Sequence, residues 1–102
     1  MNENLKTNVL VEGDDIQMIV NVPGIKKENI SIILDNGILN ISVDDSESLN
    51  KDKKYLLKER DTKYSRSFKL DNVDLDNINA EIENGQLFIN LKKNQSKSIE
   101  IK

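Results

Sequence analysis

Hydrophobic and polar residues alternate along most of the chain with a period of two. In residues 16–22, the apolar positions on one face are Ile16, Met18, Val20 and Val22. Successive side chains of an extended strand point to opposite faces, so this alternation predicts strands that bury one face. The same pattern recurs at residues 9–11, 30–34, 39–43, 68–70, 78–82 and 87–91. No stretch of ten or more residues carries a helical stripe, and we therefore predict an all-β chain.

Turn-forming residues separate the alternating segments. Asn-Gly pairs at residues 36–37 and 84–85 stand between two such segments each, and both residue types tolerate the positive φ of tight hairpin turns. A Pro-Gly pair at residues 23–24 ends the second segment. Short strands at this spacing, joined by tight turns, are typical of a β-sandwich or a β-barrel.

Two segments depart from the alternation. Residues 44–54 read DDSESLNKDKK, with Leu49 as the only apolar residue, and such long polar connections in compact domains are usually functional or mobile. The chain ends in IEIK after a hydrophilic stretch. Ile99 and Ile101 point the same way in an extended segment. They are either part of a last strand of this domain or an anchor that adds to a groove on another subunit.

Composition excludes several classes of chemistry. The chain has 102 residues, which is typical of one domain, and contains no Cys and no His. Disulfides, thiolate nucleophiles, thiolate or imidazole metal sites and Ser-His-Asp triads are therefore ruled out. The net charge of −3 argues against nucleic-acid binding. The acidic residues lie in polar turns or on opposite strand faces, so we predict no enzyme activity, no metal and no cofactor.

The sequence carries no recognisable targeting or membrane signal. Residues 1–7 lack the apolar core of a signal peptide. The apolar stretches are far shorter than the ~20 residues that a spanning helix needs. We predict a cytoplasmic protein that does not bind a membrane.

Several motifs resemble the small heat shock proteins, the Hsp20 or α-crystallin-domain family. The most specific is AEIENGQL at residues 80–87, which fits the family signature A-x-x-x-N-G-x-L. In the order of the family, the others are VPGIKKENI at 22–30, LDNGIL at 34–39, YLLKER at 55–60, YSRSFKL at 64–70 and IEI at 99–101. The resemblance as a whole runs from about residue 8 to residue 102, nearly the whole chain.

The resemblance implies an immunoglobulin-like β-sandwich of seven to eight antiparallel strands, the α-crystallin domain, whose building block is a homodimer. We assign residues 1–7 to a short N-terminal arm, 8–93 to the α-crystallin domain and 94–102 to a C-terminal extension. Family members usually carry a longer, hydrophobic N-terminal region. Only residues 1–7 precede the first expected strand here, so we expect the dimer more firmly than a large oligomer.

The resemblance also assigns the binding surfaces. Ile99 and Ile101 would be the oligomer anchor, which enters a groove between two strands of a neighbouring subunit. The groove would be lined by Ile30, Ile32, Leu34, Ala80 and Ile82. The same residues are candidates for the core, and the alternation does not decide whether Ile32 or Ile33 faces the groove.

The long excursion at residues 44–60 would be a dimerisation arm, with an ordinary hairpin loop as the alternative. The dimer interface would comprise Tyr55, Leu56, Leu57, Arg60 and Arg66. A surface salt bridge is the alternative role for Arg66.

The family implies an ATP-independent chaperone, a holdase that binds partly unfolded client proteins and limits their aggregation. The lack of a G-x-x-x-x-G-K-[ST] phosphate loop agrees with that activity. A structural or interaction module of the same fold, such as a coat component or cochaperone, is the alternative.

Overall fold

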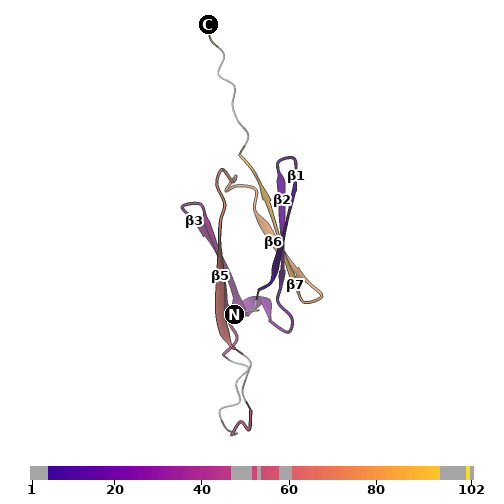
Figure 1. Cartoon of the computed structure of the whole chain (residues 1–102), viewed down its shortest axis with the longest axis vertical. Helices are drawn as coiled ribbons and strands as arrows, with labels where there is room; N and C mark the ends of the chain where they lie inside the picture. The colour runs from indigo at the N-terminus through magenta and orange to yellow at the C-terminus, as the bar shows by residue number, and fades with distance from the viewer. Residues whose placement is uncertain (1–4, 47–51, 53, 58–60, 95–100, 102) are drawn as a thin grey trace.

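Seven strands and one turn of 3₁₀ helix make up the described part of the computed structural model, which covers residues 5–46, 52, 54–57, 61–94 and 101 (Figure 1). The elements are β1 (Thr7–Glu12), β2 (Asp15–Asn21), η1 (Lys27–Asn29), β3 (Ile30–Asp35), β4 (Ile38–Asp44), β5 (Lys63–Lys69), β6 (Asn79–Glu83) and β7 (Gln86–Lys92). No helix in these ranges is long and apolar enough to cross a membrane.

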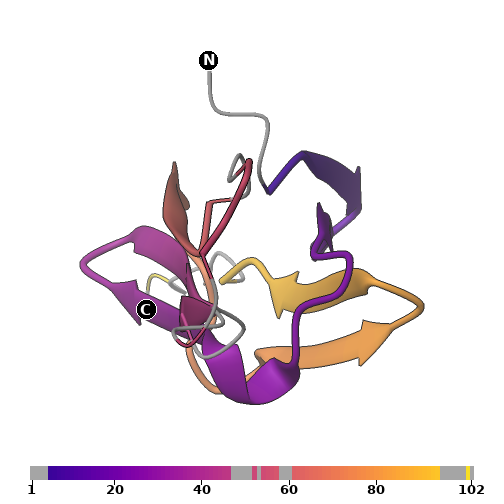
Figure 2. The same cartoon turned by 90° about the horizontal axis from the view of Figure 1, so that it is seen from below.

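The strands form two antiparallel sheets. One has the order β1-β2-β7-β6 and the other the order β3-β4-β5. The sheets face one another, with β1 and β5 along one side of the sandwich and β3 and β6 along the other (Figure 2). We call these the β1–β5 side and the β3–β6 side. The predicted all-β sandwich of antiparallel strands is confirmed.

The core lies between the sheets and follows the alternation. The central strands β2, β4 and β7 bury every second residue. Buried apolar residues outside the strands are Leu5, Val22 and Val73. The other buried apolar residues are Ile16, Met18, Val20, Leu39, Ile41, Val43, Leu87, Ile89 and Leu91. In these three strands the period of two predicts which residues are buried, whereas the inward-facing residues of the edge strands β1, β3 and β6 are half-buried or exposed.

Two of the sequence motifs are fastened to each other at one end of the sandwich. Asn84 and Gly85 have φ of 51° and 74°, as a hairpin turn requires. The N–H of Val22 donates to the carbonyl oxygen of Gly85 at 2.8 Å. A Cβ at Gly85 would lie 3.4 Å from the Cα of Pro23. The Pro-Gly and Asn-Gly segments thus stack backbone on backbone, and a side chain at residue 85 has little room.

The excursion between β4 and β5 is closed at its base. The N–H of Asp45 donates to the carbonyl oxygen of Thr62 at 2.6 Å. The side chain of Asp45 is buried, and its Oδ1 accepts a hydrogen bond from Asn29 Nδ2 at 3.1 Å. The ends of the excursion are therefore tied to η1 and to the three-stranded sheet.

Candidate functional site

The three predicted groove residues of β3 face the space between the sheets. Ile30, Ile32 and Leu34 stand opposite Val43, Ile41 and Leu39 of β4, all of which are buried. Residues directly opposite in an antiparallel pair share a face, so β3 points these three residues inward. They are only half-buried because β3 is an edge strand.

The same register decides the question that the alternation left open. Ile33 stands opposite Asn40 on the outer face of the sheet and is 58% exposed. Ile32, and not Ile33, therefore belongs to the predicted groove.

The two predicted groove residues of β6 also face inward. Ala80 and Ile82 stand opposite the buried residues Ile89 and Leu87 of β7. Ala80 is exposed and Ile82 is 37% exposed, because β6 is the edge of its sheet. All five predicted groove residues thus lie on inward faces of the two edge strands of the β3–β6 side (Figure 2).

The predicted anchor follows β7 in the sequence. Asn94 is fastened to the preceding connection, since its Nδ2 donates to the carbonyl oxygen of Val73 at 3.2 Å. Ile99 lies outside the described residues. Ile101 is 95% exposed and does not pack on its own domain. Docking of the anchor in a groove stays a prediction.

The predicted dimer interface includes Leu56, the most exposed large apolar residue of the described chain. Tyr55 is half exposed, Leu57 is more exposed, and Leu56 has full access to solvent. Arg60 lies outside the described residues. Exposed leucines on a tethered segment are a feature of partner-binding surfaces, and the two leucines have little cover from their own chain.

The edge strand β1 also carries exposed apolar residues, to which the leucines of the excursion could bind. Val9 and Val11 stand opposite Met18 and Ile16 and so face inward, yet about half of each valine is exposed. β1 pairs only with β2 among the strands described. An added strand along β1 would cover both valines and satisfy the free backbone groups of this edge.

Arg66 contacts its own chain. It stands opposite the buried Ile41, so its side chain leaves β5 on the inward face, at the rim of the β1–β5 side. Its Nη1 donates to the carbonyl oxygen of Leu5 at 3.2 Å, and its Cζ lies 4.8 Å from the centre of the Phe68 ring. Arg66 therefore connects the segment before β1 to the three-stranded sheet. Its predicted place in the dimer interface stays a prediction.

Leu5 closes the β1–β5 side. It lies in the segment assigned to an N-terminal arm, yet it is 3% exposed and belongs to the core. Its φ is +60°, an unfavourable conformation for a residue with a Cβ. Its carbonyl oxygen also accepts a hydrogen bond from Thr7 Oγ1 at 2.8 Å. A single leucine among polar residues gives no periodic signal, so the pattern did not reveal it.

The docking of Leu5 is close to energetic balance. Burial of a leucine contributes about 1.5–3 kcal/mol. The left-handed backbone costs roughly 1–2 kcal/mol, and ordering each backbone residue costs roughly 1–2 kcal/mol. A hydrogen bond to a charged donor contributes about 1.5–3 kcal/mol when shielded and less at an exposed rim. Small changes at Arg66 should therefore shift the equilibrium between a docked and a released Leu5.

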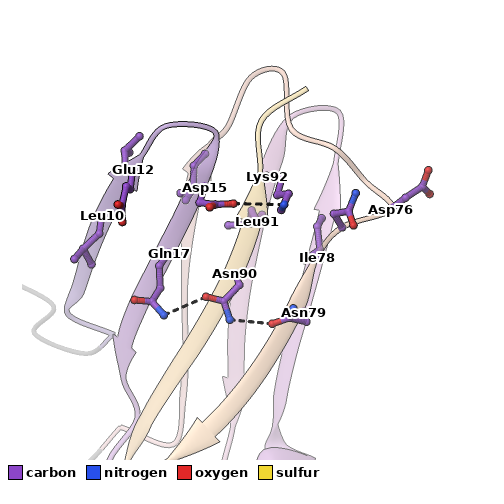
Figure 3. Close-up of a pocket in the computed structure, with 13 residues that line it drawn as sticks. Leu10, Glu12, Asp15, Gln17, Asp76, Ile78, Asn79, Asn90, Leu91 and Lys92 are labelled. Carbon is purple, nitrogen blue, oxygen red and sulfur yellow. Dashed lines mark hydrogen bonds and ion pairs between the residues drawn. The ribbon is translucent and has the colours of Figure 1, made fainter. Parts of the chain in front are cut away.

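A hollow of about 740 Å³ with a mixed polar and apolar lining lies at one end of the four-stranded sheet (Figure 3). Gln17 Nε2 donates to Asn90 Oδ1 at 3.1 Å, and Asn90 Nδ2 donates to Asn79 Oδ1 at 2.9 Å, so amides bridge three strands. Asp15 and Lys92 form an exposed ion pair at 3.8 Å. The side chains use much of their hydrogen-bonding capacity on each other. The sequence did not predict this series of hydrogen-bonded amides, because the series depends on the register between the strands.

Two carboxyl groups at loop starts have a lowered pKa. The pKa of Asp44 is lowered first by the side-chain hydrogen bond from Ser46 and then by the Ser46 N–H, which donates to Oδ1 at 3.1 Å. The pKa of Asp74 is lowered by the N–H of Asp76 and then by the Asn77 side chain. Within the described ranges, no cluster of acidic side chains is arranged to hold a metal ion.

Comparison with known proteins gives a consistent match. The family model described as "Hsp20/alpha crystallin family" matches residues 8–102. Small heat shock protein C4 of Rickettsia felis is 35% identical over 101 residues, which is 95% of this chain and 62% of that protein. The 22.0 kDa heat shock protein of Arabidopsis thaliana is 37% identical over 86 residues, 80% of this chain and 43% of that protein. This chain thus spans roughly half of the length of these two relatives.

Solved structures agree with the sequence comparison. A small heat-shock protein from Xylella fastidiosa superposes with a TM-score of 0.75 at 25% identity, covering 95% of this chain and 92% of that one. Heat shock protein 16.0 from Schizosaccharomyces pombe superposes with a TM-score of 0.71 at 28% identity, covering 99% and 100%. The likeness extends over both sheets and therefore includes both sides of the sandwich.

Proposed function

The chain belongs to the Hsp20/alpha crystallin family, and we propose that it acts as an ATP-independent holdase that binds partly unfolded proteins and limits their aggregation. The family is one of small heat shock chaperones and not of enzymes. The predicted absence of catalysis and the predicted cytoplasmic location stay predictions.

One observation supports the holdase proposal most directly. The β3–β6 side carries apolar residues that point into the sandwich from two edge strands and yet remain half-exposed, with Ile32 and Ile82 as examples. Each edge strand also has free backbone donors and acceptors. An unfolded chain offers both apolar side chains and an unpaired backbone, so strand edges of this kind suit non-native clients.

We propose that the working unit is a homodimer built by the excursion. Leu56 and Leu57 are exposed on one copy, and the half-exposed Val9 and Val11 border a free edge on the same chain. Addition of the arm of one copy to β1 of its partner would cover both sets. The contact would be reciprocal, as a two-fold dimer requires.

Higher assembly would use the C-terminal anchor. Burial of Ile99 and Ile101 contributes roughly 3–6 kcal/mol, while ordering each tether residue costs roughly 1–2 kcal/mol. A single anchor is therefore nearly balanced, and only several acting together hold an oligomer. The groove on the β3–β6 side would bind the anchor and a client in turn.

Aggregation of a heat-labile client, followed by light scattering, tests the holdase proposal. We expect suppression at about one dimer per client chain. Ile82→Lys should reduce suppression because residue 82 faces the β3–β6 side, whereas Ile33→Lys, on the outer face of β3, should not. If the unmodified protein gives no suppression, the interaction module without strong holdase activity becomes the better description.

Molar mass by size exclusion with light scattering tests the assembly. We expect Leu56→Ser to shift the dimer toward monomer, while Leu75→Ser, which alters another exposed leucine outside the arm, leaves the dimer unchanged. A chain ending at Asn94 should form dimers but lose larger species. The same mass with and without the last residues at all concentrations would exclude an intermolecular anchor.

A further inference from the structure

The beginning of β1 is fastened to the opposite sheet by one side chain. Arg66 of β5 donates from Nη1 to the carbonyl oxygen of Leu5 at 3.2 Å, and Leu5 is buried. Phe68, two residues along β5, lies under the guanidinium at 4.8 Å and limits where it can point. We propose that Leu5 and Arg66 form a latch that holds β1 in place for the partner's arm, so that Arg66 is a positioning residue for dimerisation.

The latch reaches the edge of β1 through the backbone. Thr7, the first residue of β1, donates from Oγ1 to the same carbonyl oxygen at 2.8 Å. The next carbonyl group, that of Lys6, accepts from the N–H of Asn21 at 2.9 Å and extends the pairing of β1 with β2 by one bond. Release of Leu5 would therefore free the first part of β1 from its neighbours.

The backbone conformation of Leu5 is unfavourable by itself and indicates that tertiary contacts stabilise the docked state. A leucine with φ of +60° persists only where surrounding contacts fix it. In this structure those contacts are the buried side chain and the two hydrogen bonds to its carbonyl oxygen. Of these two hydrogen bonds, the one from Arg66 comes from the other sheet.

This assignment rests on the proposed dimer and differs from a direct interface role. Arg66 is an exposed residue at the rim of the β1–β5 side, so a direct contact with the partner is the competing explanation. The two explanations differ in one respect: a positioning residue acts on the dimer only through Leu5 and β1. Loss of Leu5 must then abolish the effect of losing Arg66.

Native-state hydrogen exchange of the full chain tests the latch. The N–H of Asn21 bonds to Lys6 in the latch segment, whereas the neighbouring N–H of Val22 bonds to Gly85 on the other side of β2. After correction for intrinsic rates, Asn21 should exchange about tenfold faster than Val22, as expected for a locally opening segment. Arg66→Leu should accelerate Asn21 by about another tenfold and leave Val22 unchanged, and Arg66→Lys should restore part of the protection.

Sedimentation equilibrium of the same variants tests the positioning role. Arg66→Leu and Leu5→Asp should each raise the dimer dissociation constant about tenfold, because a carboxylate at residue 5 cannot stay in the core and moves the carbonyl acceptor away from Arg66. The double variant should raise it no further. Lys69→Leu, which removes another cation from β5 but on its outer face, should have no effect. Multiplication of the two single effects to about a hundredfold would show direct contact and overturn the proposal.

The two measurements separate this inference from the proposed dimer. If the unmodified chain is a monomer at every concentration, the dimer is wrong and the positioning role falls with it. If the dimer forms but Arg66→Leu does not accelerate exchange at Asn21, the latch is wrong and the dimer stands.

Discussion

The two open sides of the sandwich have similar edge strands but differ in how the apolar residues of these strands are covered. On each side, two edge strands point apolar residues inward, exemplified by Ile32 on the β3–β6 side and Val9 on the β1–β5 side. The β1–β5 side gains a plug, Leu5, which comes from outside the strands and is held by Arg66. On the β3–β6 side, Ile82 stays 37% exposed.

The difference shows how a small sandwich can combine stability with open binding surfaces. Leu5 covers the core only beside the beginning of β1, and Val9 and Val11 further along this strand stay about half exposed. The β1–β5 side is therefore covered in part by its own chain, whereas Ile32 and Ile82 on the β3–β6 side stand open to segments of other chains. This division requires that the half-exposed residues of the β3–β6 side contribute less to stability than residues at the centre of the core.

The largest expected effect tests this requirement directly. Ile41 and Ile32 stand opposite one another on adjacent strands, but Ile41 is fully buried and Ile32 is half-buried on the open side. Ile41→Ala should lower the free energy of unfolding by about 2–5 kcal/mol. Ile32→Ala should lower it by roughly half as much, because less of its surface leaves water on folding.

Urea unfolding of both variants provides the measurement. It is best done in a chain that ends at Asn94, so that the anchor cannot cover Ile32 in a neighbouring copy. Equal losses for the two variants would mean that the β3–β6 side is closed in solution, and the comparison between the sides would fail.

A smaller effect sharpens the comparison at one end of the β3–β6 side, where the turn between β6 and β7 meets Pro23. Gly85 and Gly24 have the same φ, +74°, but a Cβ at residue 24 meets nothing within 4 Å, whereas a Cβ at residue 85 lies 3.4 Å from Pro23 Cα. Gly24→Ala should cost about 1–2 kcal/mol from backbone conformation alone. Gly85→Ala should cost about 1 kcal/mol more because of the close contact.

Thermal unfolding of the two alanine variants measures the difference. The backbone cost is common to both, so subtraction isolates the contact between the turn and Pro23. No difference between them would show that the Pro-Gly segment moves freely and does not support the edge strand β6.

The strands and the inward-facing positions of their residues could be predicted because both depend on short-range pattern. Alternation placed Met18 and Ile89 in the core, and Asn-Gly pairs located the hairpins, since each rule concerns neighbouring residues. Ile32 could not be separated from Ile33 in advance, because both lie in an apolar run. The pairing of Ile32 with Ile41 decided it.

Features that depend on long-range contacts could not be predicted. Burial of Leu5 requires that the segment before β1 lies beside β5, and no spacing in the sequence encodes that approach. Arg66 was singled out from its motif, but its contact with the Leu5 carbonyl follows from the meeting of two sheets. The side chain of Asn90 links Gln17 to Asn79 only through strand register.

The smallest expected effect concerns the connection that crosses from β5 to β6, and so from one side of the sandwich to the other. Asp74 fixes this connection: its Oδ1 accepts from the N–H of Asp76 at 2.9 Å and its Oδ2 accepts from Asn77 Nδ2 at 2.6 Å. These bonds favour the charged form and lower the pKa of Asp74 from its ordinary value of 3.8. The folded state then binds the proton more weakly than the unfolded state does. The contribution of Asp74 to stability is therefore present at neutral pH and is lost as the pH falls through and below 3.8.

Chemical unfolding between pH 7 and pH 2.5 checks this expectation. Asp74→Asn should be less stable than the unmodified chain at pH 7, and the difference should shrink toward acid pH. Asn77→Ala removes one of the two donors and should reduce the pH dependence without abolishing it. Because both hydrogen bonds to the Asp74 carboxylate are exposed to solvent, we expect a change smaller than either of the preceding ones. A difference between Asp74→Asn and the unmodified chain that stays constant with pH would show that the carboxylate charge does not hold the crossover, and the two sides of the sandwich would then be linked by packing alone.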